Sequence, residues 1–224
     1  MNYPVWKKIL SYFIEFSIEK SSSEHNPYLE VKLVEGRHQL LTKEAIYSFD
    51  DKYENFNYAF KKINWDILEG NRILVLGLGL GSVIYILENK FHKKLDYTAI
   101  EIDPEICRLA HQYTLAYIDS FVEVITANGM DFLLSTEEKY DLIIMDIFQS
   151  AIIPEIFQTK DYLELLKQKL NVNGFILYNR MNISDTDLES NQQFRNIFLN
   201  CFKNMQEIKV KDNLIFISDN KFLK

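Results

Sequence analysis

Three of the chain's seven glycines, Gly77, Gly79 and Gly81, fall within five consecutive positions. They follow a short apolar run at 73–76 and precede a segment at 83–89 with helical spacing. A run that is apolar on both faces is typical of a strand buried inside a parallel sheet. Glycine at such a junction permits positive φ and lets a ligand approach the backbone, while the helix start adds free N–H groups. The pattern favours a binding loop, and a tight turn without a ligand is the simpler alternative.

The chain beyond this loop alternates between strands and helices. The expected strands are 73–76, 95–100, 121–126, 141–145 and 175–178. The expected helices are 83–89, 104–118, a short one from residue 130, and 160–170. This alternation predicts a doubly wound, mostly parallel α/β sheet of the Rossmann-like kind. A helix at 188–202 and two runs at 206–210 and 214–218 add a C-terminal antiparallel hairpin at the sheet edge.

The first 50 or so residues have a different pattern. Apolar and polar residues alternate at 13–19, 28–34, 39–42 and 45–48. With a turn at Gly36, this pattern predicts a small antiparallel sheet of hairpins. A packed helix is expected near the N-terminus, over 6–14, and another helix over 51–68. We therefore divide the chain into an N-terminal helix and β-hairpin domain, 1–51, and a Rossmann-like nucleoside-binding domain, 52–224.

The composition of the chain limits the kinds of molecule that it is expected to bind. Apolar residues make up 47% of the chain and charged residues 25%, as in soluble globular proteins. The net charge of −7 disfavours binding to the phosphates of nucleic acids or to anionic lipid, so we expect neither a nucleic acid nor a membrane as partner. Two cysteines, Cys107 and Cys201, cannot form a disulfide framework, which suggests a reduced, cytoplasmic protein. The four histidines share no metal-ligand spacing, so no metal site is expected.

Polar residues follow three of the predicted strands. Glu101 lies about 20 residues after the glycine loop, where a carboxylate can accept hydrogen bonds from both ribose hydroxyls of a nucleoside. Asp103 is read as the N-cap of the next helix. Asn128 either bonds an adenine edge or is a turn residue before Gly129. Asp146 either faces the crevice where open α/β sheets bind ligands or caps the segment after it.

In order and spacing, the stretch 29–179 resembles the spermidine synthase-like family, a branch of the class I methyltransferase fold. The matching pieces are Gly77-Leu78-Gly79-Leu80-Gly81, Glu101-Ile102-Asp103, Asn128-Gly129, 140–146, and 154–170 leading to Asn173-Gly174-Phe175. The resemblance implies an N-terminal hairpin domain, S-adenosylmethionine or its decarboxylated form as cofactor, and a homodimer. It also implies that Glu101 holds the ribose, that Ile102, Asn128 and Gly129 complete the cofactor site, and that Asp146 serves an attacking amine.

Three departures from the family pattern bear on the reaction. Gln149 replaces the second aspartate of the family's Asp-x-x-Asp motif. Leu80 stands where the glycine loop of the family has an acidic residue, and Tyr47 where the last N-terminal strand has a glutamine. A diamine is a dication that needs carboxylates to hold and deprotonate it, so one lost aspartate weakens that field. The uncharged Leu80 should also tolerate a cofactor that keeps its carboxylate.

These departures favour a methyltransferase acting on an unidentified small-molecule acceptor. Asp146 would orient or deprotonate the acceptor, since alignment of the reacting atoms supplies most of the catalysis. The expected acceptor pocket contains Tyr47, Leu80, Phe148 and Gln149.

Three alternatives stay open. The first is an aminopropyltransferase that makes a polyamine from decarboxylated S-adenosylmethionine, with Glu155 or Asp50 supplying the second carboxylate. The second is a non-catalytic module that binds the cofactor and serves assembly. The third is a dinucleotide-dependent oxidoreductase, which Ser82 opposes because it stands where that fingerprint has its third glycine.

Overall fold

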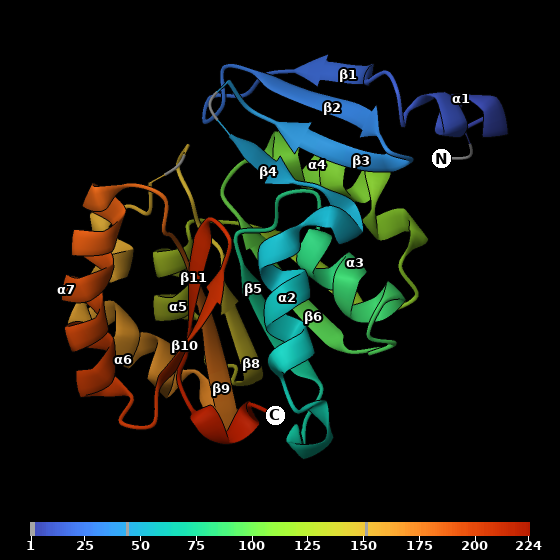
Figure 1. The fold of residues 1–224 in the computed structure, drawn as a ribbon. Helices are drawn as coiled ribbons and strands as arrows, with labels where there is room; N and C mark the ends of the chain where they lie inside the picture. Colours follow the sequence, from blue (N-terminus) through green and yellow to red (C-terminus); the bar gives the residue numbers. More distant parts are fainter. Residues whose placement is uncertain (1–2, 44, 151) are drawn as a thin grey trace.

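The computed structural model describes residues 3–43, 45–150 and 152–224. The elements form two sheets, a four-stranded antiparallel one and a seven-stranded mixed one (Figure 1). The expected α/β fold class, with a small N-terminal β-hairpin unit before a mostly parallel sheet, is confirmed. The division at residue 51 falls between the last strand of the small sheet and the first helix of the large unit, and it stays our proposed boundary.

The small sheet lies on the helix that follows the second parallel strand. Its strands run in the order β1 (Phe16–Ser21), β2 (Leu29–Val34), β3 (Arg37–Leu41) and β4 (Ile46–Ser48). Gly36 turns the chain between β2 and β3 with a φ of +73°. Leu29 and Val31 alternate onto the inner face of the sheet, where they pack against Ile106 and Leu109 of α4 (Pro104–Tyr113). This apolar contact joins the two units.

The large sheet has the order β10-β11-β9-β8-β5-β6-β7. Its strands are β5 (Arg72–Leu76), β6 (Asp96–Glu101), β7 (Val122–Thr126), β8 (Tyr140–Met145), β9 (Leu170–Met181), β10 (Gln206–Val210) and β11 (Asn213–Ile217). The five strands from β9 to β7 pair in parallel, and β11 and β10 join antiparallel at the edge. The predicted terminal hairpin is therefore present at the predicted edge.

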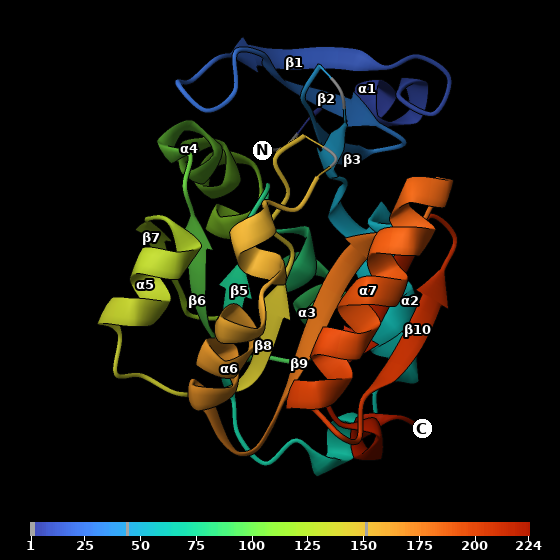
Figure 2. The ribbon, with the colours of Figure 1, turned by 90° about the vertical axis from the view of Figure 1, so that its left-hand side faces the viewer.

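Helices cover both faces of the large sheet, as seen from two directions in Figures 1 and 2. One face packs against α2 (Glu54–Lys62), α3 (Ser82–Asn89) and α4. The other packs against α5 (Gly129–Ser135), α6 (Lys160–Gln168) and α7 (Asp185–Cys201). Along β5, Ile73 and Val75 belong to the first core, and Leu74 and Leu76 to the second. Burial on both faces explains why the strand reads as a continuous apolar run.

Two predicted helices are shorter than expected. The segment 51–68 forms the 3-10 turn η1 (Asp50–Lys52), then α2, then a second 3-10 turn, η2 (Trp65–Ile67). Helix α2 ends because Ile63 is extended and bridges to Leu223 near the C-terminus. The segment 104–118 likewise divides into α4 and the turn η3 (Leu115–Tyr117).

The prediction of a packed N-terminal helix is wrong. Helix α1 (Val5–Leu10) has no buried residue, and the side chain of Trp6 is 63% exposed. Among the described helices, none is long and apolar enough to cross a membrane.

The order of the strands creates a crevice at their carboxyl ends. From β5 the sheet continues to β6 on one side and to β8 on the other, so the helices that follow these strands diverge. The N–H of Asp146 donates to the carbonyl of Leu76 at 2.8 Å, and the N–H of Gly77 donates to the carbonyl of Ile100 at 2.9 Å. These contacts bring the ends of three strands together at the point where open α/β sheets bind ligands.

Candidate active site

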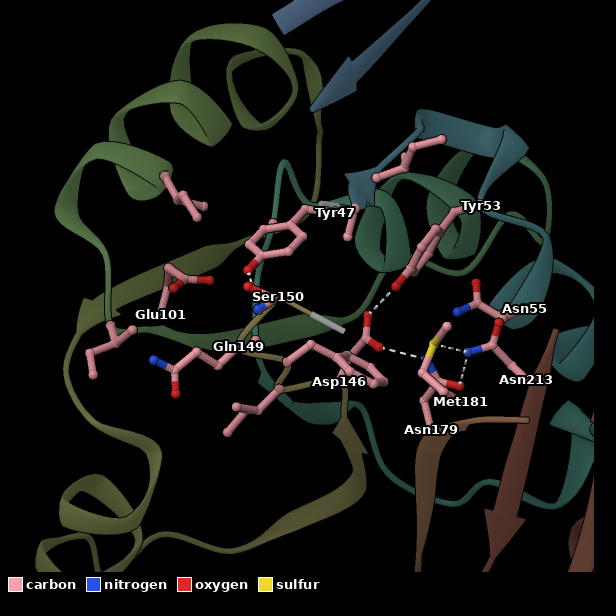
Figure 3. Close-up of a pocket in the computed structure, with 18 of the residues that line it drawn as sticks. Tyr47, Tyr53, Asn55, Glu101, Asp146, Gln149, Ser150, Asn179, Met181 and Asn213 are labelled. Carbon is pink, nitrogen blue, oxygen red and sulfur yellow. Dashed lines mark hydrogen bonds between the residues drawn. The ribbon is translucent and has the colours of Figure 1, made fainter. Parts of the chain in front are cut away.

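A cavity of about 1100 Å³ opens at these strand ends and extends beneath the small sheet. Figure 3 shows the side chains that enter it from both units of the chain. In Figure 3, Glu101 lies at the left and the Asp146 carboxylate near the centre, and the Tyr47 ring lies above and between them. A cavity of this size and mixed lining is large enough for a nucleoside and a small acceptor together.

The glycine loop brings the backbone of β5 into this cavity. Gly77 and Gly79 have positive φ values of +90° and +54°, and both line the cavity. A Cβ on Gly77 would lie 2.4 Å from the carbonyl oxygen of Asp146, so no side chain fits there. Gly81 differs from the expectation, because it begins α3 as its N-cap and lies outside the residues that line the cavity.

Glu101 is fixed by the backbone around it. Its Oε2 accepts a hydrogen bond from the N–H of Leu78, and its Oε1 accepts one from the N–H of Asp103, each at 3.1 Å. Burial raises the pKa of Glu101, and the surrounding N–H groups oppose that rise. Each oxygen keeps acceptor capacity for a hydroxyl donor. The expected ribose carboxylate is therefore held in place, facing the cavity.

The other expected nucleoside residues also line the cavity. Ile102 presents an apolar side chain that is 43% exposed. The Oδ1 of Asn128 accepts the N–H of Met130 at 2.8 Å and caps α5, so the turn alternative holds for this oxygen. Asn128 also lines the cavity. Gly129 lies close to Ile147, whose Cδ1 would be 3.0 Å from an added Cβ.

Asp146 is the centre of a hydrogen-bond network at the other end of the cavity. The hydroxyl of Tyr53 donates to Oδ2 at 2.9 Å, and the amide of Asn179 donates to Oδ1 at 2.8 Å. Asn213 in turn donates to the Asn179 carbonyl at 3.0 Å (Figure 3). Burial raises the pKa of Asp146 to about 7, although both donors act to lower it. Asp146 is thus not a helix cap but a partly buried carboxylate that is held in a fixed orientation.

The acceptor pocket expected from the sequence is partly correct. Tyr47, Phe148 and Gln149 line the cavity, and the hydroxyl of Tyr47 accepts the N–H of Ser150 at 2.9 Å. In Figure 3 the Gln149 side chain extends away from the Asp146 carboxylate. The prediction that Leu80 belongs to this pocket is wrong. Its side chain is fully buried in the core between α4 and the small sheet, and it does not line the cavity.

The two carboxylates proposed as substitutes for the missing aspartate lie elsewhere. Asp50 is buried, accepts the N–H of His38 at 2.8 Å, and has a pKa raised by burial to about 7. Glu155 begins the turn η4 (Glu155–Gln158). Neither is among the described residues that line the cavity.

The cavity is nevertheless rich in acidic groups. The described carboxylates that line it are Glu24, Glu35, Glu54, Glu101, Asp146 and Asp212. The described ammonium groups that line it are Lys52 and Lys211, and Lys52 pairs with Glu35 at 2.9 Å. This excess of carboxylates favours a cationic ligand, such as a sulfonium or an ammonium. Within the described ranges, no cluster of three or more histidine, cysteine or acidic side chains has the geometry of a metal site.

Comparison with known protein families shows which family the chain belongs to. The spermine/spermidine synthase domain matches residues 62–212, about two thirds of the chain. The chain belongs to the spermine/spermidine synthase family. A probable polyamine aminopropyl transferase of Bifidobacterium longum is 29% identical over 134 residues, which cover 60% of this chain and 29% of the relative. The chain spans less than half the length of the curated polyamine aminopropyltransferases that it matches.

Solved structures support the fold of a spermidine synthase-like protein. Spermidine synthase from Thermotoga maritima superimposes with a TM-score of 0.67 at 14% identity, covering 90% of this chain and 72% of that one. Human methyltransferase-like protein 13, in complex with SAH, gives a TM-score of 0.58 at 22% identity, covering 75% and 80%. The same architecture therefore occurs in proteins of both kinds, and the methyltransferase prediction has support from the fold alone.

Proposed function

We propose that this protein transfers an aminopropyl group from decarboxylated S-adenosylmethionine to an amine acceptor. One observation carries the proposal: Asp146, with a pKa raised to about 7, faces the same cavity as the ribose-type carboxylate Glu101. A base with a pKa near neutrality is well matched to removing a proton from an ammonium. The family membership and the names of the matched relatives favour aminopropyl transfer over the methyl transfer predicted from the sequence.

The residues on the nucleoside side fit a ribose and a cation. Glu101 would accept the ribose hydroxyls, because both of its oxygens are oriented by backbone N–H groups. Gly77 and Gly79 leave room for the nucleoside against the backbone. The excess of carboxylates in the cavity would stabilise the sulfonium. The nucleoside supplies an electrophilic carbon, whose bond to sulfur breaks with both electrons leaving on sulfur as the carbon–nitrogen bond forms.

The residues on the acceptor side would prepare the amine. An acceptor amine carries a proton at neutral pH and is not a nucleophile until it loses that proton. Ionised Asp146 would accept the proton, while Tyr53 and Asn179 hold its two oxygens in a fixed orientation. The approaching ammonium would itself lower the pKa of Asp146, so the carboxylate is ionised when the acceptor is bound.

Methyl transfer from intact S-adenosylmethionine is the second candidate. It is favoured by Gln149, which leaves the acceptor side without the paired aspartate that a diamine would use. The argument from Leu80 loses its basis, because that side chain is buried away from the cavity. The remaining argument for methyl transfer is therefore Gln149, which affects how the acceptor is bound. It gives no reason to prefer one cofactor over the other.

The two candidates are separated by their products. The purified protein would be incubated with putrescine and either decarboxylated or intact S-adenosylmethionine, and the mixtures analysed by mass spectrometry. We expect spermidine and 5′-methylthioadenosine with the decarboxylated form, and neither in the Asp146→Asn variant. Methylated putrescine with the intact cofactor, and no spermidine, would select methyl transfer instead.

A further inference from the structure

The loop between β1 and β2, residues 22–28, is anchored to the nucleoside-binding unit through one carboxylate. The hydroxyl of Ser23 donates to Oδ2 of Asp103 at 2.5 Å, and the side-chain amide of Asn26 donates to the same oxygen at 2.7 Å. The Asp103 side chain has no exposed surface. A buried carboxylate is stable only when its oxygens are paired, so this contact is an integral part of the fold.

The rest of Asp103 is tied to the glycine loop and to α4. Its Oδ1 accepts the N–H of Glu105 at 2.9 Å, which confirms the predicted N-cap. Its backbone N–H donates to Glu101, whose other oxygen holds the N–H of Leu78. Asp103 therefore connects the hairpin loop to the carboxylate placed to hold the ribose.

The anchored loop is also a wall of the cavity. Glu24, His25 and Asn26 line it together with Glu101 and other residues of the strand ends. Within the loop, the N–H of Ser23 donates to the Asn26 carbonyl at 2.8 Å. The N–H of Asn26 donates back to the Ser23 hydroxyl at 2.9 Å. The loop is thus a braced turn whose position depends on Asp103.

We propose that Asp103 is a positioning residue for nucleoside binding: it fixes the 22–28 loop as the wall that the small sheet contributes beside Glu101. It acts through Ser23 and Asn26 and does not itself line the cavity. The proposal rests on the proposed function, because that function places the nucleoside at this end of the cavity. It gives the N-terminal unit a role in ligand binding in addition to its packing on α4.

Asp103→Asn tests the proposal while preserving the helix cap. Asparagine caps helices about as well as aspartate, so the contact with Glu105 is kept. The amide nitrogen that replaces Oδ2 cannot accept from the Asn26 amide, so the loop loses the charged acceptor that holds it. We expect calorimetric titration with 5′-methylthioadenosine to show binding about tenfold weaker than in the wild type, as for the loss of about one hydrogen bond to a charged group. With the full reaction, KM for the nucleoside should rise and kcat should change little.

A second substitution tests whether the hydrogen bond itself is responsible. In Asp103→Asn combined with Asn26→Asp, donor and acceptor exchange places, and the Ser23 hydroxyl can accept from the new amide. We expect this double variant to recover most of the lost affinity. Asn26→Asp alone would place two carboxylates together and should bind more weakly than the double variant. Ser23→Ala removes one donor outside the cavity lining and should weaken binding about threefold.

Each outcome decides between the claims. If the wild-type protein binds no adenosyl compound, the proposed function fails and the role of Asp103 fails with it. If the wild type binds and Asp103→Asn and Ser23→Ala both bind within twofold of it, only the role of Asp103 is overturned. Weak binding in Asp103→Asn without recovery in the double variant also overturns that role, because it indicates general damage. Ser23→Ala keeps the test available if Asp103→Asn fails to fold.

Discussion

The hydroxyl of Tyr53 donates a 2.9 Å hydrogen bond to Oδ2 of Asp146, across a sequence separation of 93 residues. Tyr53 precedes α2, and Asp146 follows β8 at the centre of the large sheet. The contact thus joins the segment that leaves the small sheet to the strand end that carries the candidate base. It makes the ionisation of Asp146 depend on the way in which the two units are joined.

Tyr53→Phe should move the acid limb of the pH–rate profile to higher pH. The Tyr53 hydroxyl lowers the pKa of Asp146, so its removal raises that pKa above the value of about 7. A hydrogen bond to a charged group is worth about 1.5–3 kcal/mol, which corresponds to a shift of about one to two pKa units. We expect kcat/KM to fall about tenfold at pH 7 and to approach the wild-type value near pH 9.

The control for this experiment is Tyr58→Phe. Tyr58 is an exposed tyrosine of α2, the helix that begins directly after Tyr53, and it lies outside the cavity around Asp146. Its profile should coincide with that of the wild type. An unshifted acid limb in Tyr53→Phe would show that Asp146 is not the group whose ionisation limits the rate.

Asp146→Asn should abolish transfer and yet stabilise the fold at alkaline pH. An acid whose pKa is higher in the folded than in the unfolded chain binds protons more tightly when folded, so stability declines as pH rises from about 4 to about 7. Asparagine does not ionise and escapes this decline. The melting temperature of the variant should exceed that of the wild type at pH 8, by less at pH 6, and not at pH 4. A variant that is less stable at pH 8 would contradict the raised pKa.

Gly77→Ala and Gly36→Ala should differ in cost although both residues have positive φ, +90° and +73°. Around Gly36 the nearest atoms to an added Cβ lie 3.7 Å away, so alanine should cost only the backbone strain, about 1 kcal/mol. At Gly77 the Cβ would also meet the Asp146 carbonyl at 2.4 Å, and we expect a loss above about 3 kcal/mol. Denaturant unfolding of the two variants measures both losses of stability. Equal losses would mean that the backbone at Asp146 shifts at little cost to make room for the added Cβ.

The framework of this fold could be read from the sequence because its signals are local. Buried parallel strands are apolar runs, and the glycines mark the junction after β5. Such signals found all seven strands of the large sheet, although β9 extends well beyond the predicted 175–178. They overextended the helix at 51–68, since the bridge from Ile63 to Leu223 that ends it is a contact between distant segments.

The site was predicted less completely, for the same physical reason. Glu101 and Asp146 lie directly at strand ends, so their place on the sheet follows from the strand pattern. Tyr53 and Asn179 reach Asp146 only through tertiary packing, and no spacing rule connects them. The resemblance predicted Leu80 in the cavity because it stands where the family's glycine loop has an acidic residue. Alternate residues of a short loop point to different sides, and this one joins the core under the small sheet.

Gln149→Asp should improve the use of a diamine acceptor. Gln149 lines the cavity and extends away from Asp146, so a carboxylate there would face an ammonium at the far end of a bound diamine (Figure 3). An exposed ion pair contributes up to about 1 kcal/mol, so KM for putrescine should fall about threefold to fivefold. Butylamine, which has no distal ammonium, serves as the matched acceptor and should gain much less. Added salt should reduce the gain with putrescine. An equal fall in KM for both amines would contradict this prediction. It would mean that residue 149 acts on the reacting nitrogen or on the loop, and not on the second charge of the acceptor.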